Sequence, residues 1–141
     1  LSMGLDHVTP GHEVLIMDGD LIAKDEIIRY LSAFNDDRLV SREAIAPAEK
    51  GGRIRTVNGQ IDFIREEETA GAYVYSGLMK LNSTTQTTFS DLLQTELTFV
   101  EPLNQLADKT SLRNYDTSYL DAGWININNP DRLERARKQF A

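Results

Sequence analysis

The chain has 141 residues, of which 40% are hydrophobic and 26% are charged, and it contains no cysteine. These values predict a single domain over residues 1–141 with a hydrophobic core, and they exclude disulfides and a thiolate zinc site. The net charge of −7 argues against nonspecific binding to nucleic acid or an anionic membrane. Because the sequence shows no membrane-spanning run and no signal peptide, we expect a cytoplasmic location.

Residues 14–20 read Val-Leu-Ile-Met-Asp-Gly-Asp. The unalternated apolar run predicts a strand buried on both faces, and ligands of open α/β sheets bind beyond the carboxyl ends of such strands. Asp18 and Asp20 offer carboxylate oxygens, which suit Mg²⁺ or Mn²⁺, and Gly19 between them would let a phosphate approach the backbone. The alternative interpretation is a strand followed by an ordinary acidic turn.

The next part of the chain alternates helical and strand patterns. Residues 24–34 have the apolar spacing of an amphipathic helix, and residues 39–46 are strand-like. Two alternating runs, residues 53–57 and 60–65, flank Asn-Gly and therefore predict a β-hairpin. Residues 72–81 predict a further strand, which a glycine interrupts.

The second half continues the mixture. After a polar stretch at residues 83–88, the pattern predicts helices at 89–97 and 99–109 and an edge strand at 112–120. Residues 123–128 predict a strand with Trp124, Asn126 and Asn128 on one face, and residues 129–140 a helix with Asn129 as its N-cap. Residues 1–8 fit the end of a helix. Strands and helices that intermix in this way predict an α/β fold with a mixed sheet.

Three segments, taken in order, resemble the sugar-phosphate and phospho-alcohol nucleotidyltransferases. Residues 14–20 resemble that family's strand ending in Gly-Asp, and residues 52–81 resemble its central hairpin and following strand. Residues 123–133, Gly-Trp-Ile-Asn-Ile-Asn-Asn-Pro-Asp-Arg-Leu, resemble its closing signature and are the most specific of the three. The resemblance implies a mostly parallel, Rossmann-like sheet.

The resemblance also implies a site. By position, Asp20 and Asn128 become the catalytic residues that hold Mg²⁺ or Mn²⁺, although most relatives have an aspartate at the second place. Glu66 resembles the glutamate that accepts hydrogen bonds from sugar hydroxyls, and Gly77 the glycine against which the sugar lies. Asp18 and Gly19 are assigned to the substrate. Some branches follow the glutamate with a lysine, where this chain has another glutamate.

The implied reaction is attack of a sugar phosphate or phospho-alcohol on the α-phosphate of an NTP, with release of pyrophosphate. The family's Gly-rich loop, which cradles the triphosphate, has no counterpart before Asp18. We therefore expect the carboxyl-terminal part of such an enzyme, without the first nucleotide-binding portion. The chain alone should not turn over, and it should belong to a longer chain or pair with another copy.

Two other functions remain open. A metal-dependent glycosyltransferase also uses Asp-x-Asp to hold a nucleotide sugar, although residues 128–133 favour the nucleotidyltransferase. A noncatalytic nucleotide-sugar-binding or assembly module would fit the missing loop and the asparagine at the second metal position.

Overall fold

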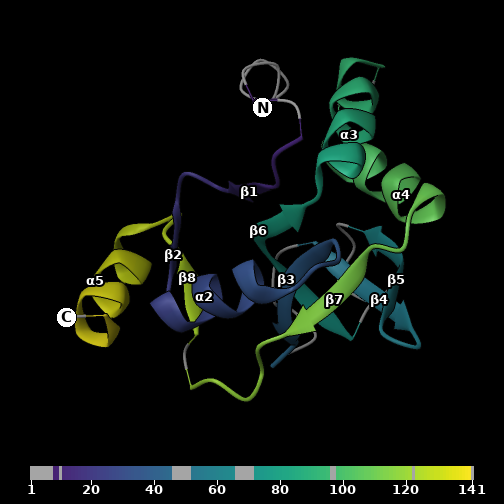
Figure 1. The fold of residues 1–141 in the computed structure, drawn as a ribbon. Coiled ribbons are helices and arrows are strands. Elements are labelled where there is room, and N and C mark those ends of the chain that lie inside the picture. The colour runs from purple at the N-terminus through teal and green to yellow at the C-terminus, as the bar shows by residue number, and fades with distance from the viewer. Residues whose placement is uncertain are drawn as a thin grey trace.

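The computed structural model describes residues 8–9, 11–45, 52–65, 72–95, 98–121 and 123–140. Strands and helices alternate along the chain, which confirms the predicted mixed α/β class (Figure 1). In chain order the elements are β1 (Val14–Met17), β2 (Leu21–Ala23), α2 (Asp25–Ala33), β3 (Arg38–Glu43), β4 (Arg53–Val57), β5 (Gln60–Arg65), β6 (Tyr73–Leu81), α3 (Ser83–Thr95), α4 (Val100–Lys109), β7 (Arg113–Asp116), β8 (Trp124–Asn126) and α5 (Pro130–Gln139).

The strands form a six-stranded sheet in the order β1-β6-β3-β7-β5-β4 and a separate two-stranded sheet of β2 and β8. Among the described residues β3 and β7 make the parallel pair, and every other pair is antiparallel. The sheet is therefore mixed, as predicted, but the expectation that it is mostly parallel is wrong. The reason is that β6 lies between β1 and β3, which share one direction, and runs opposite to both.

Strand β6 is the centre of the large sheet. One of its edges pairs with β3, and the other pairs with β4 near its start and with β1 near its end. Gly77 lies between the last two pairings, and its φ of +89° is a conformation that glycine adopts far more readily than other residues. Strand β6 thereby brings the end of β1 against the middle of the sheet.

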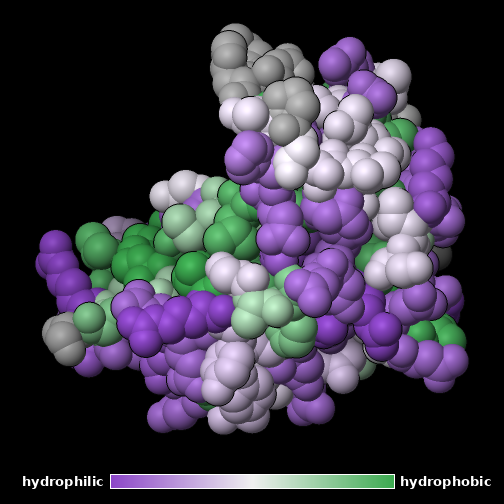
Figure 2. Space-filling model, viewed as in Figure 1, coloured by the Kyte–Doolittle hydropathy of each residue, from purple (hydrophilic) through white to green (hydrophobic). Residues whose placement is uncertain are grey.

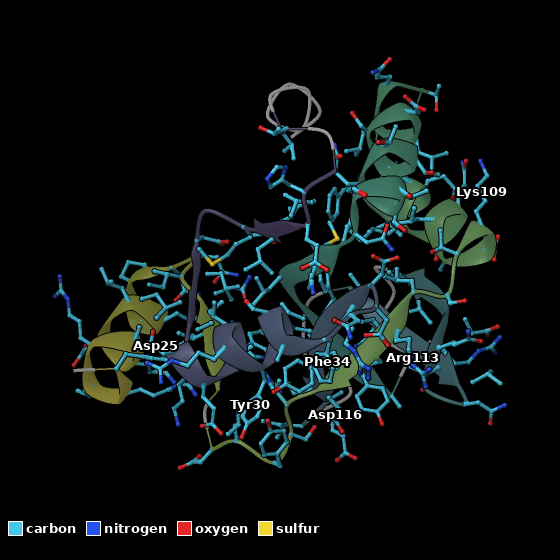
Figure 3. The ribbon with its side chains drawn as sticks, in the orientation of Figure 1. Asp25, Tyr30, Phe34, Lys109, Arg113 and Asp116 are labelled. Atoms are coloured by element: carbon cyan, nitrogen blue, oxygen red, sulfur yellow. The ribbon has the colours of Figure 1, made fainter. Side chains whose placement is uncertain are left out.

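Two hydrophobic clusters hold the elements together. In Figure 1, α3 and α4 lie on one side of the sheet, while β2, β8 and α5 lie to the other side near α2. Buried residues on the α3–α4 side are Ile16, Leu39, Ile54, Ile61, Ile64, Met79, Leu81, Phe89, Leu92, Leu103, Leu106 and Leu112. Those on the α2–β8 side are Leu21, Ile27, Leu31, Val40, Val74, Leu78, Tyr115 and Trp124. Asp25, at the start of α2, and Phe34, just past its end, are labelled in Figure 3.

The prediction that β1 is buried on both faces is wrong. Leu15 is 42% exposed and Met17 is 54% exposed, while Ile16 between them is buried. Strand β1 lies at the edge of the sheet, and only the face that carries Ile16 is packed against the rest of the molecule. The apolar run therefore indicates an uncovered surface and not a doubly covered strand.

Several local predictions are confirmed. The hairpin β4–β5 turns at Asn58 and Gly59, whose φ angles of 53° and 77° are the positive values that this turn requires. Helix α5 begins where predicted, because the Asn129 side chain accepts a hydrogen bond of 2.9 Å from the Arg132 backbone N–H.

Two predicted elements need correction. Helix α3 begins at Ser83 and not at Phe89, because the Asn82 side chain caps it by accepting from the backbone N–H of Thr84 and Thr85. The Asp37 carboxylate in turn accepts a hydrogen bond of 2.6 Å from the Asn82 backbone N–H. Strand β7, predicted at an edge, lies inside the sheet between β3 and β5. The helix end predicted at residues 1–8 falls almost wholly outside the described residues.

Candidate functional site

The turn of residues 18–20 connects the two sheets. Strand β1 ends at Met17 in the large sheet, and β2 begins at Leu21 in the small one. The Leu21 backbone N–H donates to the Asp18 carbonyl at 3.2 Å, and this bond closes the turn. Asp18, Gly19 and Asp20 are all exposed. The predicted site residues therefore lie at a junction where the chain leaves one sheet for another.

The end of β8 lies beside this turn. Leu21 is paired with Asn126, and the Ile127 backbone N–H donates to the Asp20 carbonyl at 2.7 Å. Asp20 therefore lies opposite Ile127, the residue next to Asn128. Asn128 is exposed, and its side chain accepts a 3.2 Å hydrogen bond from the Asn129 side chain. Although more than a hundred residues separate them in sequence, Asp20 and Asn128 belong to adjoining backbone segments.

Gly77 of β6 is the third part of the site. The Asp18 backbone N–H donates to the Gly77 carbonyl at 2.9 Å, and the Asp18 side chain lies directly over the glycine. A β-carbon added to Gly77 would lie 2.2 Å from Asp18 Oδ2 and 2.6 Å from its Cγ. Asp18 therefore occupies the space that the glycine leaves open. Gly19, by contrast, has nothing within 4 Å of the position where a β-carbon would lie.

The electrostatics of the turn reflect two neighbouring carboxylates. Asp18 is exposed overall, but its side chain lies against Gly77, and this local burial raises its pKa above the ordinary value. The negative charge of Asp20 raises this pKa further. Burial also raises the pKa of Tyr75 on β6, with an additional contribution from Asp18. The Tyr75 hydroxyl is buried and has no hydrogen-bond partner among the described residues. A cation at the turn would relieve the repulsion between the two aspartates.

The donor set suits a hard divalent cation. The described residues contain no group of three or more histidine, cysteine, aspartate or glutamate side chains that could hold a metal by themselves. Magnesium does not need such a cage, because it commonly binds one or two carboxylates and completes its shell with water and substrate phosphate. Asp18 and Asp20 fit the carboxylate part of that pattern, and Asn126 and Asn128 belong to the backbone segment that adjoins them.

Asn126 is a site residue that sequence reasoning did not assign. Its side-chain amide donates to the Ser76 carbonyl at 3.2 Å, so it fastens β8 to β6 next to Gly77. The sequence did carry a signal for Asn126: the alternation of Trp124, Asn126 and Asn128 placed it on the same face as Asn128, the predicted metal ligand. Glu66, the predicted sugar-binding residue, lies outside the described residues.

An uncovered apolar surface adjoins the turn. It forms a hollow of about 520 Å³, and Figure 2 shows hydrophobic side chains gathered over β1 and β2. The β1 edge beyond it has no partner strand among the described residues. We call this surface the β1–β2 apolar patch; its lining residues are Leu15, Met17, Leu21, Ile22, Ala23, Ile28 and Leu78. Separately, no helix in the described ranges is long and apolar enough to cross a membrane.

The fold of this chain is similar to that of several solved structures, each of which is longer than the chain. A protein from Bacillus anthracis assigned as a glucose-1-phosphate thymidylyltransferase superposes with a TM-score of 0.76 at 20% identity, over 98% of this chain and 58% of its own. The inositol-1-phosphate CTP transferase from T. maritima superposes with a TM-score of 0.72 at 14% identity, over 94% of this chain and 55% of its own. HddC from Yersinia pseudotuberculosis superposes with a TM-score of 0.64 at 16% identity, over 99% of this chain and 60% of its own.

At these identities the superpositions show a shared fold alone, and the chain spans less than two thirds of the length of each of the three proteins. No protein-family model and no curated protein matches the sequence.

Proposed function

We propose that this chain is the carboxyl-terminal part of a nucleotidyltransferase that joins a nucleoside monophosphate from an NTP to a sugar phosphate or a phospho-alcohol. The observation that carries the proposal is the meeting of the Asp18–Asp20 turn with the end of β8, in a fold shared with two structures named as a thymidylyltransferase and a CTP transferase. These two act, by their names, on glucose 1-phosphate and inositol 1-phosphate.

Asp20 and Asn128 would hold Mg²⁺ or Mn²⁺, with Asn126 as a further amide close to them. When bound, the metal would neutralise charge on the NTP phosphates. Gly19 lies in open space, which leaves its backbone accessible to a phosphate. Asp18 covers Gly77, so an acceptor hydroxyl group reaching β6 meets this carboxylate before it meets the glycine.

The β1–β2 apolar patch supports the second part of the proposal, that further polypeptide packs beside β1. An edge strand with unpaired backbone groups and exposed Leu15 and Met17 is prone to pair with another strand. That polypeptide, from the same protein or a second copy, would supply further donors to the NTP phosphates at the turn of residues 18–20. We expect the site to be complete only with it.

The test is an assay of pyrophosphate release with Mg²⁺, each of the four NTPs and a panel of sugar and alcohol phosphates. The longest natural protein that contains these residues should release pyrophosphate only when both substrates are present. The isolated 141 residues should release none, because loss of even one oxyanion-type donor lowers a rate roughly 100-fold or more.

Two results would contradict the proposal. Absence of release by the longer protein with every substrate pair would remove the assigned reaction, and transfer from a nucleotide sugar to an acceptor would replace it with a glycosyltransferase. Robust turnover by the isolated chain would show that no further polypeptide is needed.

A further inference from the structure

A second cavity lies away from the site described above. It has a volume of about 570 Å³ and is bounded by the end of β3, the loop between β7 and β8, the start of β8 and one face of α5. None of Asp18, Gly19, Asp20, Gly77 or Asn128 lines it. Its size lies within the range of cavities that bind small molecules. We call it the arginine pocket.

Three arginines from two elements line the arginine pocket. Arg132 and Arg135 are three residues apart and therefore share one face of α5, while Arg42 comes from β3. Two acids, Glu43 and Asp121, also line it, which leaves an excess of positive charge in a chain of net charge −7. A local excess of guanidinium groups in an acidic protein favours an anionic ligand.

The two α5 arginines are not used by the fold. Among the described residues neither the Arg132 guanidinium nor the Arg135 guanidinium makes an ion pair or a hydrogen bond, while the Arg132 backbone N–H donates to the Asn129 cap. Glu134, their neighbour, instead pairs with Lys138 at 2.8 Å. Glu134, which lies between the two arginines in sequence, is therefore paired with a cation outside the pocket.

The opposite wall of the pocket is held firmly. The Arg42 guanidinium lies 5.0 Å from the centre of the Trp124 ring. The Trp124 indole N–H donates to Thr117 Oγ1 at 3.2 Å, and the Thr117 hydroxyl donates to the Ser41 carbonyl at 2.7 Å. A fixed wall reduces the entropy that a ligand must lose on binding.

We propose that the arginine pocket binds a small anion with a diphosphoryl group, either free or on a nucleoside. Arginine is suited to this ligand because its planar guanidinium makes paired hydrogen bonds with phosphate oxygens. Arg132 and Arg135 together contact the phosphoryl oxygens, and Arg42 bounds the opposite wall. The site is separate from the proposed metal-binding turn and does not depend on it.

The test is calorimetric titration of the 141-residue chain with inorganic pyrophosphate in EDTA, so that no metal bridges the anion to the acidic turn. We compare wild type with Arg132→Gln, Arg135→Gln and, as the matched control, Arg137→Gln on the same helix outside the pocket. Each pocket variant should weaken binding roughly tenfold, because a hydrogen bond to a charged group is lost. The control should bind as wild type does.

A parallel titration with a nucleoside diphosphate distinguishes the two sources of the anion. Tighter binding than pyrophosphate would assign the pocket to a nucleotide, and equal or weaker binding to the free anion. Circular dichroism checks that each variant folds, and amide chemical-shift changes locate the ligand independently of the variants. Unchanged affinity in both pocket variants, no binding by wild type, or shift changes confined to other elements would overturn the proposal.

Discussion

Asp20→Asn is expected to weaken Mn²⁺ and Mg²⁺ binding at least tenfold without unfolding the domain. The substitution removes a full negative charge from a hard-oxygen ligand, and these cations depend strongly on carboxylate charge. Asp20 is exposed, so its side chain contributes little to packing. Isothermal titration with Mn²⁺ measures the dissociation constant, and thermal unfolding measures stability in the same samples.

Two control variants isolate the effect. Asp18→Asn should weaken binding less than Asp20→Asn, because the Asp18 carboxyl faces Gly77 and its pKa is raised by partial burial and by Asp20. Asp108→Asn, on the exposed surface of α4, removes the same charge from a different element and should leave metal binding unchanged. Equal dissociation constants for wild type and Asp20→Asn would refute the assignment of Asp20.

Gly77→Ala should lower the free energy of unfolding by about 2 kcal/mol or more. A φ of +89° strains an L-residue, and the new β-carbon would overlap the Asp18 side chain at 2.2 Å. The displaced Asp18 would also move the turn that carries Asp20. Urea unfolding of wild type and variant gives the difference directly.

Gly11 provides a matched control for the backbone term alone. Its φ is +86°, almost that of Gly77, but nothing lies within 4 Å of its β-carbon position. Gly11→Ala should therefore lower the free energy of unfolding only through backbone strain, and by less than Gly77→Ala does.

A double-mutant cycle separates the steric term. Asp18→Gly removes all the side-chain atoms that the new methyl group would meet, so it should recover about 1 kcal/mol of the loss in Gly77→Ala. Equal costs for Gly11→Ala and Gly77→Ala, with no coupling to Asp18, would show that Asp18 does not occupy this space.

The features that sequence predicted well are those with local causes. Asn58 and Gly59 define their hairpin because both positions need positive φ, whatever surrounds them. Asn129 caps α5 through a bond to a residue three positions away. The end of strand β1 just before Asp18 was predicted for a similar reason, since the end of an apolar run is visible in the chain itself.

The features that the sequence did not predict depend on residues far away in the chain. The apolar run at β1 was interpreted as buried because a sequence cannot show what covers each face, and here Leu15 and Met17 are uncovered. Strand β7 lies inside the sheet because β3 and β5 flank it, which no local pattern encodes. The role of Asn126 likewise appears only when β8 is placed against β6.

The turn of residues 18–20 and the end of β8 are expected to form one divalent-metal site. Paramagnetic broadening of backbone amide signals by substoichiometric Mn²⁺ tests it most directly, because the effect falls steeply with distance from the ion. Broadening should be strongest at Gly19, Asp20 and Leu21 and, together with them, at Asn126 to Asn128. Broadening of the turn without β8, or strongest broadening on α3 or α4, would contradict the claim.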